Sequence, residues 1–179
     1  MNFKSIIKKI LLFLASVLVI IQFFRPEKNI SGQMDQDISK QYAVNSEVQA
    51  ILKKACYDCH SNTTVYPWYA GIQPAAWWLA DHVKEGKGEL NFNAFLDYPL
   101  YRQFHKLEEV AEVLEEGEMP LSSYTLIHRN AILSDAEKNL LIQWSRNVRD
   151  TMSARYPADS LISPKKRAVA KEEQESENE

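Results

Sequence analysis

Five consecutive residues, Cys56-Tyr57-Asp58-Cys59-His60, constrain this chain more than any other feature. They hold both cysteines of the 179-residue sequence and one of its four histidines. Two cysteines at this spacing serve four kinds of chemistry: a redox dithiol, a disulfide, half of a zinc site and covalent attachment of haem. The residues around the motif favour one of the four.

The first three alternatives fit the surrounding sequence poorly. A redox dithiol begins a helix that follows a strand, whereas this motif ends a predicted helix and no strand precedes it. A structural zinc site usually needs a second closely spaced pair of ligands, and His82, His105 and His128 are too far apart to supply one. A disulfide that closes so short a loop stabilises a protein little and gives His60 no role.

Covalent attachment of haem uses all three residues of the motif. The thiols of Cys56 and Cys59 form thioether bonds with the two vinyl groups of a porphyrin, and His60 brings its imidazole to the iron as the proximal ligand. The motif therefore predicts one covalently attached haem c.

The first 25 residues predict a membrane anchor or export signal. Three lysines, at positions 4, 8 and 9, precede a run over 10–24 with only two polar residues. With its lysines extended toward the headgroups, a helix from Phe3 onward is long enough to span a bilayer, so we expect an uncleaved N-terminal transmembrane helix. The basic end stays in the cytoplasm, which places the remaining residues on the periplasmic or another extracytoplasmic side.

Composition divides the rest of the chain into a linker over residues 26–44, a folded domain over 45–156 and a charged tail over 157–179 that we expect to be disordered. Hydrophobic periodicity within the domain predicts about four helices and no strand, so the expected fold class is all-α. The long loops of this small domain need another surface to pack against, and a buried prosthetic group supplies one.

Capping residues set the predicted helix boundaries. The first helix starts at Asn45 or Ser46 and ends at the motif; Pro74 opens the second and Gly86 ends it. The third runs over 98–116 and stops at Gly117, and a capping box of Ser134 and Glu137 opens the fourth. Five aromatic residues after the motif are expected to form both core and pocket wall, namely Tyr66, Trp68, Tyr69, Trp77 and Trp78.

An iron held by His60 has a second axial position, for which Met119 is the first candidate. It lies in the loop "GEMPLS", where Pro120 restricts its backbone to an extended conformation. The alternatives are a histidine, with His82 next in order, and an open position. Of the other two histidines, His105 is expected on a solvated helix face, and His128 with Arg129 either on a loop surface or against a haem propionate.

Several segments resemble known proteins. "CYDCHSNTTVYPWY", "DHVKEGKGELNFNAF" and "EGEMPLSSYTLIHRNAILS" resemble a small haem-binding-domain family of bacterial exported proteins, and "CYDCH", "GEMP" and "LSDAEKNLLIQW" look like class I cytochrome c. The resemblance covers residues 45 to about 148. It implies Cys56 and Cys59 as thioether positions, His60 as proximal ligand and Met119 as distal ligand.

Two axial protein ligands leave no open iron position for a substrate. The sequence therefore predicts a membrane-tethered electron carrier, not an enzyme, that works with an unknown redox protein partner. The alternative is a haem-based sensor or peroxidase-like enzyme with an open or bis-histidine distal side. The net charge of −3, from 21 basic and 24 acidic residues, argues against a nucleic-acid partner.

Overall fold

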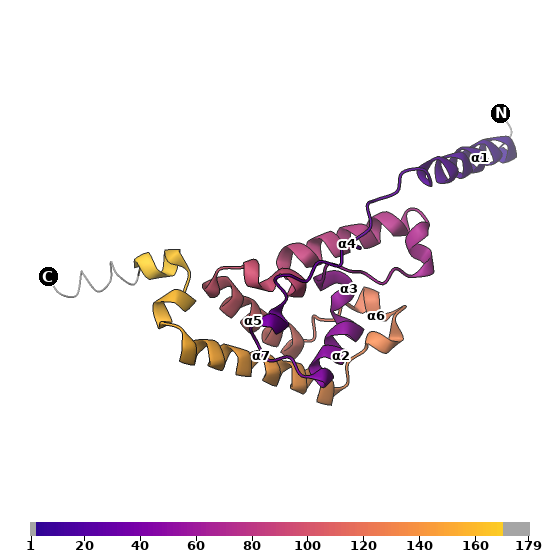
Figure 1. Ribbon diagram of the computed structural model, residues 1–179. Helices are drawn as coiled ribbons and strands as arrows, with labels where there is room; N and C mark the ends of the chain where they lie inside the picture. Colours follow the sequence, from indigo (N-terminus) through magenta and orange to yellow (C-terminus); the bar gives the residue numbers. More distant parts are fainter. Residues whose placement is uncertain (1–2, 170–179) are drawn as a thin grey trace.

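The computed structural model describes residues 3–169, and Figure 1 shows them as a set of helices joined by loops and short turns. The α-helices are α1 (Phe3–Ile21), α2 (Ser46–Ala55), α3 (Tyr57–His60), α4 (Ala75–Glu89), α5 (Leu100–Glu115), α6 (Ser122–Thr125) and α7 (Asp135–Arg155). The 3-10 helices are η1 (Ile38–Lys40), η2 (Trp68–Gly71), η3 (Phe92–Asp97), η4 (Arg129–Ala131) and η5 (Ala158–Leu161). The described residues contain no strand, only an isolated bridge between Ile30 and Thr63, so the all-α prediction is confirmed.

Helix α2 begins as the sequence predicts but ends before the motif. The side chain of Asn45 accepts a hydrogen bond from the backbone N–H of Val48 at 2.8 Å, which caps the helix. At Cys56 the backbone leaves helical geometry, with φ −123° and ψ −41°, and α3 follows as a separate turn. The last four residues of the motif, Tyr57 to His60, therefore form a separate helical turn.

Helices α5 and α7 pack along each other and carry much of the core (Figure 1). The predicted capping box is confirmed, because Ser134 and Glu137 exchange hydrogen bonds between side chain and backbone at the start of α7. Leu107 of α5 and Leu141 and Met152 of α7 are fully buried. Helix α2 packs against α7, whereas α3, which carries most of the motif, packs against α4.

The sequence predicts that Gly86 and Gly117 each end a helix, which is confirmed for Gly117 and wrong for Gly86. Gly117 has a φ of +75° just after α5, a conformation in which glycine is favoured. Gly86 lies inside α4, which continues to Glu89. A Cβ at Gly86 would lie 2.9 Å from the Cβ of Cys59, so this glycine allows α3 to approach α4 closely.

The folded unit extends beyond the predicted domain boundaries of 45–156 at both ends. In the segment predicted as a linker, Ile38 and Tyr42 are buried in the core. At the other end, Leu161 of η5 is buried in the same core, and residues 164–169 are helical. Isolated apolar residues in polar segments carry no periodic signal, which explains why the sequence pattern missed them. Residues 170–179 of the predicted tail lie outside the described residues.

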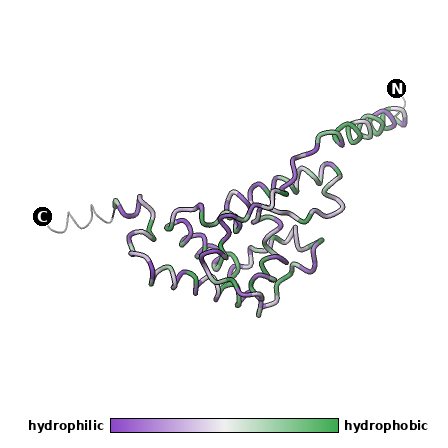
Figure 2. Tube along the Cα trace, viewed as in Figure 1, coloured by the Kyte–Doolittle hydropathy of each residue, from purple (hydrophilic) through white to green (hydrophobic). Residues whose placement is uncertain are grey.

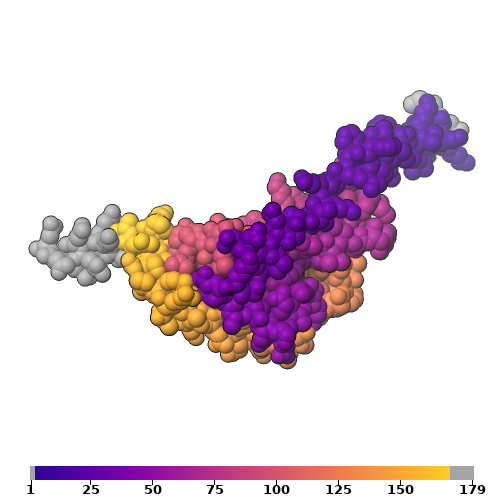
Figure 3. Space-filling model, in the orientation of Figure 1, coloured from indigo at the N-terminus to yellow at the C-terminus, as the bar shows by residue number. Residues whose placement is uncertain are grey.

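Helix α1 extends away from the body of the molecule (Figure 3), and much of its trace is hydrophobic (Figure 2). Most of its large apolar side chains are exposed. Over residues 3–169, no helix combines the length and apolar character needed to cross a membrane, so the predicted transmembrane helix is corrected. The lysines at positions 4, 8 and 9 belong to the helix itself, and they shorten its apolar part.

The segment after α1 is joined to the domain by hydrogen bonds. The backbone N–H of Gln73 donates to the Gln22 side chain at 3.0 Å. The carbonyl oxygen of Phe24 accepts from the side-chain amide of Gln73 at 2.7 Å and from the indole of Trp77 at 2.9 Å. These bonds fix the exit of α1 against the start of α4.

Candidate haem site

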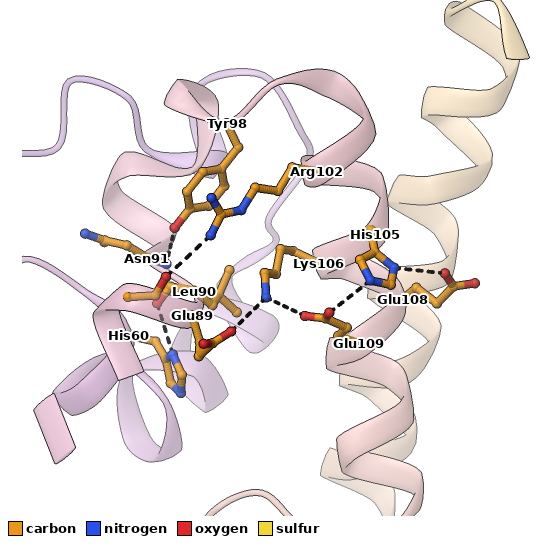
Figure 4. Close-up of polar contacts among 11 residues, drawn as sticks. His60, Glu89, Leu90, Asn91, Tyr98, Arg102, His105, Lys106, Glu108 and Glu109 are labelled. Carbon is orange, nitrogen blue, oxygen red and sulfur yellow. Dashed lines mark hydrogen bonds and ion pairs between the residues drawn. The ribbon is translucent and has the colours of Figure 1, made fainter. Parts of the chain in front are cut away.

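His60 is held by one ring nitrogen, which leaves the other free. Its Nδ1 lies 3.0 Å from the carbonyl oxygen of Leu90, a distance at which Nδ1–H donates to that oxygen. Figure 4 shows this contact, with the second ring nitrogen pointing away from Leu90. Burial lowers the pKa of His60, so the ring stays neutral at pH 7 and Nε2 keeps its lone pair. A neutral imidazole with Nδ1 fixed in this way is the form that ligates metals.

The two cysteines are free thiols, half-buried beside His60. Burial is the main cause that raises the pKa of Cys56 to about 12 and that of Cys59 to about 11. Catalytic dithiols instead have a lowered thiol pKa, so these two do not match a redox dithiol. Within residues 3–169, no three His, Cys, Asp or Glu side chains gather in an arrangement that could hold a metal ion.

Two adjoining cavities lie between the motif and the segment around Met119. The first has a volume of about 360 Å³ and runs from Cys56 and His60 along the apolar faces of α5 and α7. The second, also about 360 Å³, lies between α3 and α4 and includes Cys59. Six residues line both: Ala55, Cys56, His60, Glu89, Met119 and Pro120. These shared walls make the cavities two parts of one slot, within the size range of ligand sites.

Met119 faces this slot from a loop with a defined anchor. We call residues 117–121 the Met119 loop. The backbone N–H groups of Glu118 and Met119 both donate to the carbonyl oxygen of Val113, at 2.9 and 3.3 Å, so the loop is tied to the last turn of α5. Met119 itself is half-buried. The structure thus brings together all four predicted site residues, Cys56, Cys59, His60 and Met119, around one slot.

The other three histidines lie in different surroundings, and only His82 lines the slot. His82 lines the second cavity, its Nδ1 is 2.9 Å from the carbonyl oxygen of Trp78, and its ring packs on the Trp78 indole. His105 is 60% exposed and contacts the carboxylates of Glu108 and Glu109, as expected for a solvated helix face. His128 bonds through Nε2 to the hydroxyl of Tyr69 at 2.9 Å. His82 is therefore the histidine placed best to compete with Met119.

A largely buried lysine with two carboxylate partners, at the edge of the slot, was missed by the sequence pattern. Lys106 has a side chain only 10% exposed, and its ammonium contacts Glu109 at 2.7 Å and Glu89 at 3.1 Å (Figure 4). Burial lowers the pKa of Lys106, but the hydrogen bonds to Glu109 and Glu89 outweigh this and raise it overall. Lys106 stays charged, and it joins α5 to the end of α4 beside His60.

The prediction that the aromatic residues after the motif form the pocket wall is wrong for the tryptophans and also for Tyr66 and Tyr69, which do not line the slot. Trp68 is 82% exposed, and Trp77 and Trp78 are exposed on α4. None of the three lines either cavity of the slot. The apolar walls instead come from aliphatic residues and one phenylalanine, including Leu52, Leu90, Phe92, Val110, Leu133 and Leu141. Aromatic content after the motif was a poor guide because α4 turns only one face toward α3.

The donor set and the slot fit haem. Two thiols stand at one edge, an imidazole with a free nitrogen and a thioether line the space beside them, and aliphatic side chains form the walls. This fold and site define an all-helical haem-binding protein.

Comparison with known families agrees with that assignment. The chain belongs to the haem-binding domain family, whose model matches residues 16–147. The match begins within α1 and includes the segment predicted as a linker, which agrees with the burial of Ile38 and Tyr42. Searches of curated proteins and of solved structures found no match.

Proposed function

We propose that this protein is a c-type cytochrome that carries electrons, with one haem attached through Cys56 and Cys59 and ligated by His60 and Met119. The observation that carries the proposal is that His60, Met119 and Cys56 all line both parts of one slot. Haem bound in this way supplies a one-electron couple of Fe(III) and Fe(II). Class I cytochromes c share this ligand set, as the sequence resemblance implies.

Each residue of the slot has a separate task under this proposal. The carbonyl oxygen of Leu90 orients the His60 ring and makes Nε2 a stronger donor. The Met119 thioether favours Fe(II) and raises the reduction potential relative to a second imidazole. Aliphatic side chains such as Leu52, Leu90 and Leu141 give one wall of the slot a low polarity, which would disfavour Fe(III). Together these residues favour electron transfer over catalysis at the iron.

A pyridine haemochrome assay on protein produced with the c-type maturation machinery tests the attachment. We expect one haem per chain with a spectrum typical of two thioether bonds. Cys56→Ser and Cys59→Ser should each shift the spectrum toward that of one thioether bond, and the double variant should lose covalent haem. Wild-type protein without covalent haem would contradict the proposal.

Ligation by Met119 is tested against ligation by His82. In Met119→Ala we expect the reduction potential to fall and ferrous iron to bind carbon monoxide, because the sixth position opens. His82→Ala should leave both properties unchanged, since His82 lines only one part of the slot. The opposite result for these two variants would identify a bis-histidine site. The specific feature in favour of that alternative is the fixed Nδ1 of His82, which leaves its Nε2 available.

A haem-based sensor or peroxidase-like enzyme is the second candidate function. It requires an open or displaceable sixth position, and carbon monoxide binding to untreated ferrous wild-type protein would favour it. The anchoring of the Met119 loop to Val113 supports the electron carrier instead, because a fixed thioether closes that position.

We also propose that the domain lies on the extracytoplasmic side and associates with a membrane through α1. Support comes from the exposed apolar side chains of α1, such as Leu11 and Leu18, and from the lysines near its start. We expect the full chain to float with liposomes that contain anionic lipid. Leu11→Asp with Leu18→Asp should abolish flotation, whereas Ile162→Asp, an exposed apolar residue near the other end, should not.

A further inference from the structure

The spacer between the two cysteines is hydrogen-bonded to the segment that follows Met119. The hydroxyl of Tyr124 in α6 donates to Oδ2 of Asp58 at 2.6 Å. Asp58 lies in the middle of the attachment motif, between Cys56 and Cys59. Both Asp58 and Tyr124 line the second cavity, so their hydrogen bond closes one side of the slot.

Asp58 is itself held in place from the other side. Its Oδ1 accepts from the backbone N–H of Val65 at 3.0 Å, and its backbone carbonyl accepts from the hydroxyl of Thr64 at 2.6 Å. Thr64 is buried. Asp58 thus presents a fixed carboxylate oxygen to Tyr124, and a hydrogen bond to a charged acceptor of this kind is among the stronger ones in proteins.

Tyr124 is equally constrained. Its ring stacks on the ring of His128, with centroids 4.4 Å apart and planes 11° from parallel, and the Nε2 of His128 bonds to the hydroxyl of Tyr69 at 2.9 Å. The backbone N–H of Tyr124 donates to the carbonyl oxygen of Leu121, which ends the Met119 loop. A movement of the loop away from the motif would therefore have to move Tyr124 as well.

The Met119 loop then has two anchors, one on each side. Val113 of α5 holds its beginning through two backbone hydrogen bonds, and Asp58 holds its end through Tyr124. The first anchor uses only backbone groups, so side-chain substitution does not remove it. The second depends on one hydroxyl group.

We propose that Tyr124 is a positioning residue, which keeps Met119 on the iron by hydrogen bonding to Asp58 of the haem-attachment turn. This inference rests on the proposed function, because it assumes that Met119 is the distal ligand. The CxxCH motif and the Met119 loop are then coupled directly, through Asp58, which lies between the two cysteines. Loss of the hydroxyl should let the loop open more often, and the sixth position should then accept an external ligand.

Imidazole titration of the ferric, haem-loaded full-length protein tests this coupling. The variants are Tyr124→Phe, Asp58→Asn, Met119→Ala and, as a matched control, Tyr66→Phe. The control removes a hydroxyl that accepts a hydrogen bond from the backbone of Asn29 at 2.7 Å, and Tyr66 does not line the slot. The absorption spectrum reports replacement of the thioether by imidazole, and thermal unfolding reports the stability of each variant.

We expect Tyr124→Phe to raise the apparent association constant for imidazole roughly 10- to 100-fold, in line with the loss of a hydrogen bond to a charged group. Tyr66→Phe should stay within about twofold of wild type, and Met119→Ala should give the largest increase. Asp58→Asn keeps an oxygen for Tyr124 but loses the charge, so it should give a smaller increase than Tyr124→Phe. It also serves as the deciding variant if Tyr124→Phe does not accumulate.

The possible failures can be told apart. If Met119→Ala binds imidazole no better than wild type, Met119 is not the ligand and the proposed ligation is wrong. If Met119→Ala shows the increase but neither Tyr124→Phe nor Asp58→Asn does, the ligation stands and the positioning role of Tyr124 is overturned. An equal increase in Tyr66→Phe and Tyr124→Phe would also overturn it, because it would show a general loosening of the fold.

Discussion

The Nδ1 of His60 lies 3.0 Å from the carbonyl oxygen of Leu90, the residue directly after the end of α4. Leu90 is buried and its backbone N–H is tied to Gly86, so this carbonyl is held in position. The contact selects the tautomer with the proton on Nδ1 and leaves the lone pair on Nε2. A residue 30 positions away in the chain thus orients the histidine of the motif.

Substitution of His60 by alanine should remove the proximal ligand while the thioether bonds remain. We expect His60→Ala to lose the low-spin spectrum, and external imidazole to restore it in part, because the imidazole can enter the space of the lost ring. Absorption spectra with and without imidazole measure the effect. His105→Ala, at an exposed histidine on α5, should keep the wild-type spectrum. A low-spin spectrum in untreated His60→Ala would show that another residue holds the iron.

Gly86→Ala adds only one methyl group, but it should disturb α3, the turn that carries Cys59 and His60. The added Cβ would lie 2.9 Å from the Cβ of Cys59 and 3.0 Å from its carbonyl oxygen, so α3 has to move. We expect a loss of about 1–3 kcal/mol in the free energy of unfolding and less covalent haem. Chemical denaturation and the haemochrome assay measure the two effects.

Gly88→Ala provides the control for this prediction. It lies two residues later in the same helix, and an added Cβ there meets no atom within 4 Å. Alanine favours helix, so this variant should be as stable as wild type or more stable by up to about 1 kcal/mol. Equal stability of the two variants would mean that α3 does not pack closely on Gly86.

The thiols of the haem-free protein should react slowly with alkylating reagents. Burial raises the pKa of Cys56 to about 12 and of Cys59 to about 11, so very little thiolate is present at pH 8. We expect iodoacetamide to modify them at least ~100-fold more slowly in the folded protein than in urea. Mass spectrometry over time gives both rates. Similar rates in the two conditions would show that the thiols are not buried.

The ion pair between Lys54 of α2 and Glu137 of α7 should contribute to stability in a defined pH range. Hydrogen bonds from Lys54 and from the backbone of Ser134 lower the pKa of Glu137 from 4.5 to about 2. A depressed pKa stabilises the folded state above the unfolded-state pKa, and this contribution is lost as the pH falls from about 4.5 toward 2.

Urea unfolding of wild type and Glu137→Gln between pH 7 and pH 2 checks this. We expect the variant to be less stable at neutral pH and the difference to shrink as the pH falls from about 4.5 toward 2, because Glu137 becomes protonated in the unfolded state first and then in the folded state. Lys54→Gln should show the same trend, and the double variant should lose little more than either single one. A difference that stays constant with pH would assign the effect to packing.

Local signals in the sequence predicted much of the fold. Asn45, the Ser134–Glu137 capping box and Gly117 each act through nearby backbone groups, and the structure has all three as predicted. The motif and the Met119 loop were predicted to form one site, and they line one slot.

Long-range contacts could not be predicted in this way. Glycine is typical of helix ends, so the local pattern predicts a helix end at Gly86. Its actual role depends on the approach of Cys59, which no local pattern encodes. Ile38 and Tyr42 lie in a polar segment without periodicity, and their burial depends on α5, α7 and η3 together. Tyr124, Asp58 and Lys106 act through partners that are remote in the sequence. Their partners become visible only when the chain is folded.

Hydrogen bonds at the exit of α1 restrict how the domain can turn relative to that helix. The bonds of Gln22 and Phe24 to Gln73 and Trp77 leave little freedom of rotation where the helix leaves the domain. For a domain attached to a surface through α1, the slot then faces one direction at one height. Under the proposed function, electron exchange is then limited to molecules that arrive in that orientation, and the domain does not swing from a donor to an acceptor.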